Sequence, residues 1–107
     1  GAIVQGLGGT LLEHLIYDEN GQLVTATLAD YLLPAADSFP SIHVHAFEDH
    51  PAPHNPLGAK GAGEGGIVPV GGVIANAVAA ALERFNVKPN ALPLTPARVW
   101  AMIQERA

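Results

Sequence analysis

Apolar and polar positions divide the first half of the chain into one helical and two extended stretches. From Ala2 to Tyr17 the apolar residues recur at helical spacing, which predicts an amphipathic helix. Leu23–Leu28 and Ile42–Phe47 instead alternate along the chain in the manner of half-buried strands. The Asn20-Gly21 pair between the helix and the first strand is typical of a turn.

The second half begins with a long Pro- and Gly-rich loop, His50–Gly66, and then becomes helical. Loops of such length without secondary structure are usually functional or disordered. Apolar residues at helical spacing predict a helix from about Pro69 to Phe85, and Thr95 followed by Pro96 marks the start of a last helix. The buried face predicted for the last helix consists of Val99, Trp100, Met102 and Ile103. Residues 1–107 are expected to form one domain or a piece of one, of class α+β, with helix, two strands, long loop and two helices in that order.

Composition limits what the core can be. The 107 residues include 12 Gly and 9 Pro but only three Phe, two Tyr and one Trp, so the expected core is thin and needs a partner or further polypeptide. A net charge of −5 without a basic cluster argues against nucleic acid and anionic membranes as partners. The absence of cysteine excludes disulfides, iron–sulfur clusters and zinc–thiolate sites within the chain. No segment resembles a signal peptide or a membrane span, so a cytoplasmic location is expected.

Glu64 is the one carboxylate in the glycine-rich segment Asn55–Gly66, just before the second predicted helix. Glycines let a backbone approach a bulky ligand, and a carboxylate with few polar neighbours can act as a general base. The string Gly61-x-Gly63-x-x-Gly66 matches the dinucleotide-binding fingerprint, but a Pro-rich loop precedes it where that fingerprint requires a strand. A glycine run alone is more often a tight turn that packs a helix closely, while phosphate binding at the following helix N-terminus stays open.

The five histidines form no recognisable metal motif. His43 and His45 share one face of the second predicted strand, whereas His50 and His54 lie among prolines in the loop. Metal ligation requires side chains that converge with a defined geometry, and no HExxH or comparable spacing is present. Ordinary surface or loop histidines are therefore favoured, and no protein-ligated metal is predicted.

Five segments stand in order along nearly the whole chain: Val4-Gln-Gly-Leu-Gly8, Asp30-Tyr-Leu-Leu-Pro34, Asn55-Pro-Leu-Gly-Ala-Lys-Gly-Ala-Gly-Glu64, Ile74-Ala-Asn-Ala-Val78 and Leu92-Pro-Leu-Thr-Pro-Ala-Arg-Val-Trp100. Together they resemble the QGxG, DYxxP, NPLGxKGxGE, IANAV and LPLTPxRVW motifs of the molybdenum hydroxylases. That family includes xanthine oxidase, aldehyde oxidoreductase and carbon monoxide dehydrogenase. The match is to the C-terminal part of its large, molybdopterin-binding subunit. Any one segment alone is weak evidence for the resemblance, but five segments in the same order are strong evidence.

The resemblance implies a cofactor and roles for particular residues. In that family molybdenum is held by the dithiolene of a pterin cofactor, which suits a chain without cysteine; the resemblance implies molybdopterin in its cytosine dinucleotide form. By the same resemblance, Glu64 is the general base that takes the proton from the hydroxyl group on molybdenum, and water supplies the oxygen atom. The cofactor-binding residues that it implies are Gln5, Gly6, Lys60, Gly61 and Gly63.

The resemblance also implies a larger assembly. The large subunit would oxidise an aldehyde, an N-heterocycle or CO, with [2Fe-2S] and FAD on partner subunits. Partners would be the remainder of the large subunit, the Fe–S and flavin subunits, a small-molecule substrate and further copies. The isolated chain is expected to be inactive, because about a hundred residues rich in Gly and Ala cannot enclose the cofactor. The alternative is a non-catalytic, self-associating or partner-docking α+β module derived from this family, against which the presence of Glu64 and Gln5 counts.

Overall fold

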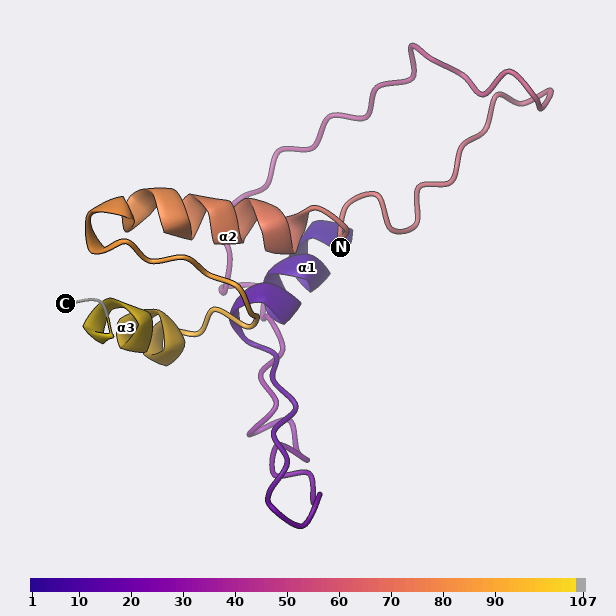
Figure 1. Ribbon diagram of the computed structural model, residues 1–107. Helices are drawn as coiled ribbons and strands as arrows, with labels where there is room; N and C mark the ends of the chain where they lie inside the picture. The colour runs from indigo at the N-terminus through magenta and orange to yellow at the C-terminus, as the bar shows by residue number, and fades with distance from the viewer. Residues whose placement is uncertain (106–107) are drawn as a thin grey trace.

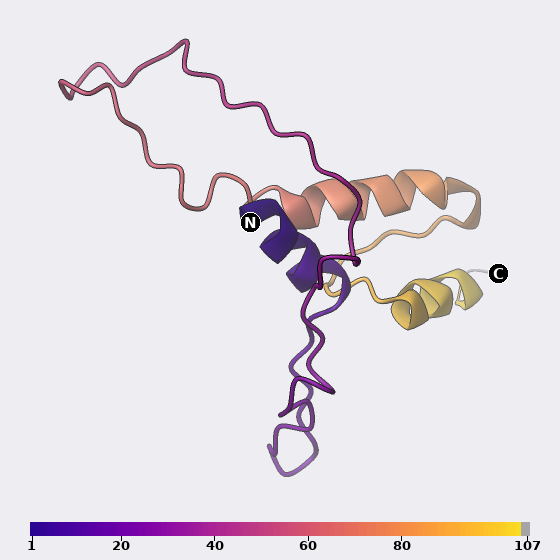
Figure 2. The same cartoon turned by 180° about the vertical axis from the view of Figure 1, so that it is seen from behind.

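The computed structural model describes residues 1–105 and consists of helices joined by long irregular segments (Figure 1). The helices are α1 (Ala2–Leu11), α2 (Val70–Ala81) and α3 (Pro96–Gln104), with a 3-10 helix, η1 (Glu83–Phe85), after α2. The radius of gyration is 17.8 Å, where a compact domain of this length has about 13 Å. Two long irregular segments between α1 and α2 extend away from the helices and explain the larger radius of gyration (Figures 1 and 2). The chain therefore lacks the shape of a self-contained domain.

The first helix ends earlier than the apolar spacing predicts. α1 stops at Leu11, and the predicted helical turn up to Tyr17 is irregular. The Thr25 hydroxyl, in a buried residue, donates to the His14 carbonyl oxygen at 2.9 Å and accepts from the Ile16 amide at 3.0 Å. These bonds use backbone groups that a continued helix would need. The prediction of a helix to Tyr17 is wrong for this reason.

Neither predicted strand is present in residues 1–105, where the one β contact is an isolated antiparallel bridge between Tyr17 and Leu23. In Leu23–Leu28 the Thr25 side-chain hydroxyl bonds to the backbone of His14 and Ile16, where a β-ladder would use backbone groups on both sides. Ile42–Phe47 carries no helix, turn or ladder assignment, and a strand exists only where a neighbouring strand pairs with it. The helical part of the predicted α+β class is present, and the two-strand part is wrong for this chain.

The small core lies where α1 crosses α2 and meets the segment that leads to α3. Its buried apolar residues are Val70, Val87 and Leu94. Gly6 of α1 faces Val70, because a Cβ at residue 6 would lie 2.7 Å from Cβ and Cγ2 of that valine. The Leu94 amide donates to the Thr10 carbonyl oxygen at 2.6 Å, which ties the last segment to α1. The expectation of a thin core is confirmed.

The predicted start of the last helix is confirmed. Thr95 is the N-cap of α3, its hydroxyl accepts from the Arg98 amide at 3.3 Å, and Pro96 occupies the first helical position. The predicted buried face is not buried within this chain: Val99, Met102 and Ile103 are half-buried and Trp100 is 64% exposed. Within residues 1–105 no helix combines the length and the apolar character needed to cross a membrane.

The Asp30–Pro34 segment holds the first irregular segment after α1 against the end of that helix. The Tyr31 hydroxyl donates to the Glu13 carboxylate at 2.5 Å, and the Asp30 carboxylate accepts from the Thr27 hydroxyl at 2.8 Å. Pro34 lies against Gly8, where a Cβ would be 2.9 Å from the proline Cδ. This motif therefore has a structural use within the chain.

Candidate functional site

Glu64 lies in a tight turn that leads directly into α2. Its carbonyl oxygen accepts from the amides of Ile67 at 3.1 Å and Val68 at 3.2 Å, which fixes the backbone at this residue. The residue itself is exposed in this chain. A fixed backbone with a free carboxylate is what a positioned acid or base requires, because the proton acceptor must be held within reach of its partner.

The turn that carries Glu64 packs against the beginning of α1. A Cβ at Gly66 would lie 2.9 Å from the Ala2 Cβ and 3.5 Å from the Ile3 Cγ1, so the absence of a side chain permits this approach. Gln5 lies one turn further along α1, and its residue is exposed. Figures 1 and 2 both show the N-terminus of α1 beside the beginning of α2. The structure thus brings the segments of two predicted site residues, Glu64 and Gln5, to one end of the helical layer.

An apolar recess of about 320 Å³ lies at this same end. Its walls come from α1, from the turn after Glu64 and from α2: Ile3, Leu7, Gly65, Gly66, Pro69, Val70, Val73 and Ile74. An apolar recess beside a few polar groups is the usual composition of a small-molecule site. The recess is open, and closing it requires polypeptide outside this chain.

Gly6, a predicted cofactor-binding residue, is buried at the crossing of α1 and α2. Val70 covers it, and its carbonyl oxygen accepts from the Thr10 hydroxyl at 2.6 Å. The lack of a side chain at residue 6 is therefore used for helix packing. Gln5, its neighbour on α1, is the exposed member of the pair.

Gly61 and Gly63 face open space, since no atom of the described chain lies within 4 Å of a Cβ built at either residue. The backbone amides from Lys60 to Gly66 donate no hydrogen bond to any group in residues 1–105. Consecutive free amides in a glycine-rich turn suit an anionic or oxygen-rich ligand. The donor set of this segment therefore fits the phosphate and pterin oxygens of the cofactor expected from the sequence.

Asn55 organises the loop ahead of this segment, a role that the sequence interpretation missed. Its Oδ1 accepts from the amides of Leu57 at 3.1 Å and Ala59 at 2.9 Å, and its Nδ2 donates to the Ala59 carbonyl oxygen at 2.9 Å. Gly58 has a φ of +64°, and a Cβ there would lie 2.7 Å from the Pro51 Cβ. The Asn-Pro pair that begins this turn is a known turn signal and could have identified Asn55.

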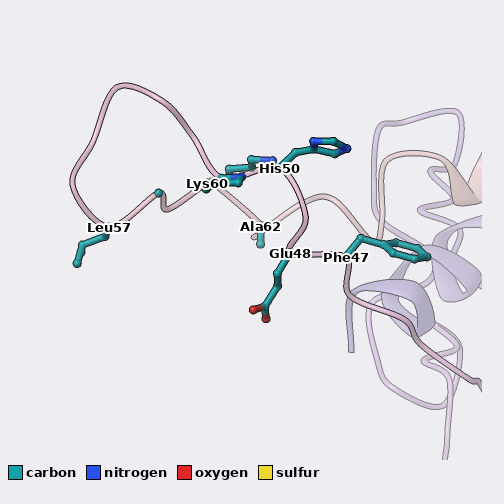
Figure 3. Close-up of a pocket in the computed structure, with 8 residues that line it drawn as sticks. Phe47, Glu48, His50, Leu57, Lys60 and Ala62 are labelled. Atoms are coloured by element: carbon teal, nitrogen blue, oxygen red, sulfur yellow. The ribbon is translucent and has the colours of Figure 1, made fainter.

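Lys60 lines a pocket of about 460 Å³ formed by the two limbs of the long loop (Figure 3). The pocket walls are Phe47, Glu48, His50, Pro51, Leu57, Gly58, Lys60 and Ala62. Neither Glu64 nor Gln5 lines it. The five predicted cofactor residues are thus divided between this pocket, the open glycine segment and the α1–α2 crossing.

No three His, Asp or Glu side chains come together as a metal site anywhere in residues 1–105. The glycine-rich segment itself carries the ionisable residues Lys60 and Glu64, and Glu48 and His50 line the pocket across from Lys60.

A family model for the molybdopterin cofactor-binding domain matches residues 1–40. Over 97% of its length the chain is 43% identical to 6-hydroxypseudooxynicotine dehydrogenase complex subunit gamma of Paenarthrobacter nicotinovorans. Over 92% it is 37% identical to the nicotine 6-hydroxylase large subunit of the same organism. The chain covers 13% and 12% of these relatives.

Solved structures agree with the sequence matches. The whole chain superposes on quinoline 2-oxidoreductase from Pseudomonas putida 86 with a TM-score of 0.92 and 43% identity, covering 14% of that chain. A Cu,Mo-CO dehydrogenase matches 98% of the chain with a TM-score of 0.82 and 28% identity. The relatives are molybdenum-dependent oxidoreductases. The chain belongs to the molybdenum hydroxylase family and corresponds to a segment of its molybdopterin-binding subunit.

Proposed function

We propose that the chain supplies the general base and part of the cofactor wall of a molybdenum-dependent hydroxylase. In that enzyme the complete large subunit oxidises a small substrate with oxygen from water. The observation that carries the proposal is the position of Glu64. Its residue is exposed on a turn with a fixed backbone, beside free amides and an apolar recess.

The residues of this chain suit the binding of molybdopterin, in its cytosine dinucleotide form, along one wall. The amides from Lys60 to Gly66 and the exposed Gln5 side chain offer donors, and the open positions at Gly61 and Gly63 allow close approach. The Lys60 ammonium group adds a positive charge for an anionic phosphate. When bound, the cofactor supplies the molybdenum that takes up electrons from the substrate.

Glu64 acts as the proton acceptor. Its carboxylate oxygens take up the proton that is released as the substrate is oxidised, and the fixed carbonyl oxygen holds the residue at the mouth of α2. Side chains from the remainder of the subunit would exclude water from the recess beside it. The chain alone is expected to be inactive, since the buried apolar core of residues 1–105 consists of Val70, Val87 and Leu94 and the recess is open.

A nitrogen heterocycle is the substrate class that we favour over an aldehyde or CO. The two matches at 43% identity bear the names of quinoline and of a nicotine-derived compound, whereas a matched aldehyde oxidoreductase subunit is 37% identical and a matched carbon monoxide dehydrogenase large chain is 34% identical. By analogy with the complexes to which such subunits belong, [2Fe-2S] and FAD subunits would receive the electrons, in an oligomeric, cytoplasmic enzyme.

The test is Glu64→Gln in the complete large subunit with its partner subunits. The change keeps the size of the side chain and removes its basicity, so we expect molybdenum content to stay the same and turnover to fall by about 100- to 10,000-fold. Molybdenum is measured by elemental mass spectrometry, and turnover is measured in parallel with quinoline, benzaldehyde and CO. Glu83→Gln is the matched control, because it makes the same carboxylate-to-amide change at an exposed residue of η1; it should leave turnover unchanged.

Turnover of Glu64→Gln close to that of the unaltered enzyme would contradict the role of Glu64. A subunit that assembles without molybdenum and without turnover on any of the three probes would favour the alternative, a docking module derived from the family. Activity on quinoline together with none on CO would support the proposed substrate class.

A further inference from the structure

Residues 42–47 form an extended segment whose backbone has no partner in this chain. Between Phe39 and Pro51 no backbone amide or carbonyl group takes part in a hydrogen bond within residues 1–105. Glycine and proline are absent from residues 41–50, and Ile42 and Val44 are β-branched. Such a composition favours a strand over an irregular loop. The segment therefore has the sequence of a strand and lacks only a neighbour to pair with.

Both faces of the segment also carry exposed apolar side chains. In an extended chain, successive side chains point to opposite faces, so Val44 and Phe47 lie on different sides. Val44 is 70% exposed and Phe47 is 85% exposed. One face carries Ile42 and Val44, and the other carries Phe47 together with His43 and His45. A strand at the surface of a protein buries at least one face. The missing neighbour must therefore provide a paired strand and a layer that covers at least the face of Ile42 and Val44.

The remainder of the subunit is the polypeptide that can meet this requirement. The chain covers only 13% of its relative from Paenarthrobacter nicotinovorans and 14% of quinoline 2-oxidoreductase, so most of such a subunit lies outside it. The same path of the chain, over its whole length, occurs in that solved oxidoreductase with a TM-score of 0.92. The extended path of the segment that contains residues 42–47 (Figure 2) is thus the conformation of a segment inside a much larger chain. A second copy of residues 42–47 would pair one edge and leave both faces exposed, and two-stranded pairs are marginal alone.

We propose that residues 42–47 form a strand that pairs with a sheet in the remainder of the molybdopterin-binding subunit. This inference rests on the proposed function only in that the chain must be part of such a subunit. The strand anchors the upstream end of the loop that carries Lys60, Gly61 and Gly63. The packing of Gly66 on Ala2 anchors the downstream end, so the loop is held at both ends beside Glu64.

Amide hydrogen exchange in the complete, molybdenum-loaded subunit tests the pairing. We expect the amides of residues 42–47 to exchange at least about 100-fold more slowly than unstructured peptide, because paired amides exchange only when the strand opens. Val44→Pro removes one donor and should restore fast exchange across the segment, whereas Val44→Thr keeps the amide and a β-branched side chain and should not. His45→Pro tests the opposite edge, since the amides of adjacent residues point to opposite edges of a strand.

Protection in the unaltered subunit, lost in at least one proline variant and kept in Val44→Thr, supports the proposal. Fast exchange of residues 42–47 in a subunit that contains molybdenum and turns over would overturn it and leave the proposed function intact. Protection that falls on dilution, with cross-links between two copies of this segment, would identify a second copy as the occupant and also overturn it. If Glu64→Gln turns over normally while the amides of residues 42–47 are protected, the role of Glu64 as the base is refuted and the strand pairing stands.

Discussion

Gly6→Ala tests whether the crossing of α1 and α2 holds the site together. A methyl group at residue 6 would lie 2.7 Å from Cβ and Cγ2 of Val70 and 3.2 Å from its Cγ1. Carbon atoms pack at about 3.5–4.0 Å, so the helices must separate by about 1 Å at this point. Overpacking of this kind costs about 1–3 kcal/mol, and the better helix propensity of alanine offsets about 1 kcal/mol.

A double-mutant cycle with Val70→Gly isolates the packing cost. This second substitution removes all three of the atoms that the methyl group would meet, and the helix-propensity gain at residue 6 is the same in both backgrounds. Gly6→Ala should therefore be destabilising with Val70 present and neutral or stabilising with Gly at residue 70. The expected coupling is the packing cost itself, about 1–3 kcal/mol.

Local hydrogen exchange is the appropriate assay, because a large subunit with a cofactor does not give one well-defined free energy of unfolding. A coupling of about 1–3 kcal/mol corresponds to a difference of about 5- to 150-fold in the exchange of α1 amides across the cycle. Molybdenum content should fall in Gly6→Ala and recover in the double variant, since α1 also packs against the turn that carries Glu64. Additive effects of the two substitutions on exchange would refute the reasoning.

Two smaller perturbations test local features of the fold. Thr95→Ala removes the cap on the Arg98 amide and should weaken α3 by about 1 kcal/mol, whereas Thr95→Ser keeps the hydroxyl; faster exchange of the α3 amides in the alanine variant alone is the expected result. The hydrogen bond from Tyr31 to Glu13, then partial desolvation and then the carboxylate charge raise the pKa of Tyr31 above its ordinary 10.0. The fold favours the neutral phenol of Tyr31. The contribution of its hydrogen bond to the free energy of unfolding is therefore complete below about pH 10 and is lost as the pH rises through the raised pKa. The stability difference between the unaltered protein and Tyr31→Phe should thus be constant from about pH 8 to pH 10 and shrink above; a difference that stays constant to about pH 11 would contradict it.

Local signals in the sequence predicted the features that depend on neighbouring residues. Thr95 and Pro96 identified the start of α3, because capping and proline placement act within one turn. The helix expected from about Pro69 to Phe85 is present as α2 and η1, since its apolar spacing is regular. The end of α1 was missed because the Thr25 hydroxyl, eleven residues from His14, takes up the backbone groups that the helix would have used.

Features that depend on distant residues or on other polypeptide could not be predicted in this way. The strand pattern at residues 42–47 is a property of the sequence, but the partner that would make it a strand is outside the chain. Trp100 belongs to the apolar stripe of α3 and is nevertheless exposed, because no element of residues 1–105 covers it. The approach of the turn that carries Glu64 to the beginning of α1 arises from the contact of Gly66 with Ala2, which the order of motifs along the chain does not reveal.

The glycines of this chain separate into those that the chain itself explains and those that it does not. Gly6 and Gly66 lie against side chains of the same chain, so close packing accounts for them. Gly61 and Gly63 have neither a close neighbour nor the positive φ that disfavours other residues, and a methyl group would fit at both positions within this chain. Gly9 and Gly72 are open in the same way but lie inside helices. In the irregular segment before Glu64 an open glycine costs conformational entropy without a local benefit, and a group that approaches the backbone would supply one. We infer that this approach is made from outside the chain, on the segment that leads to Glu64.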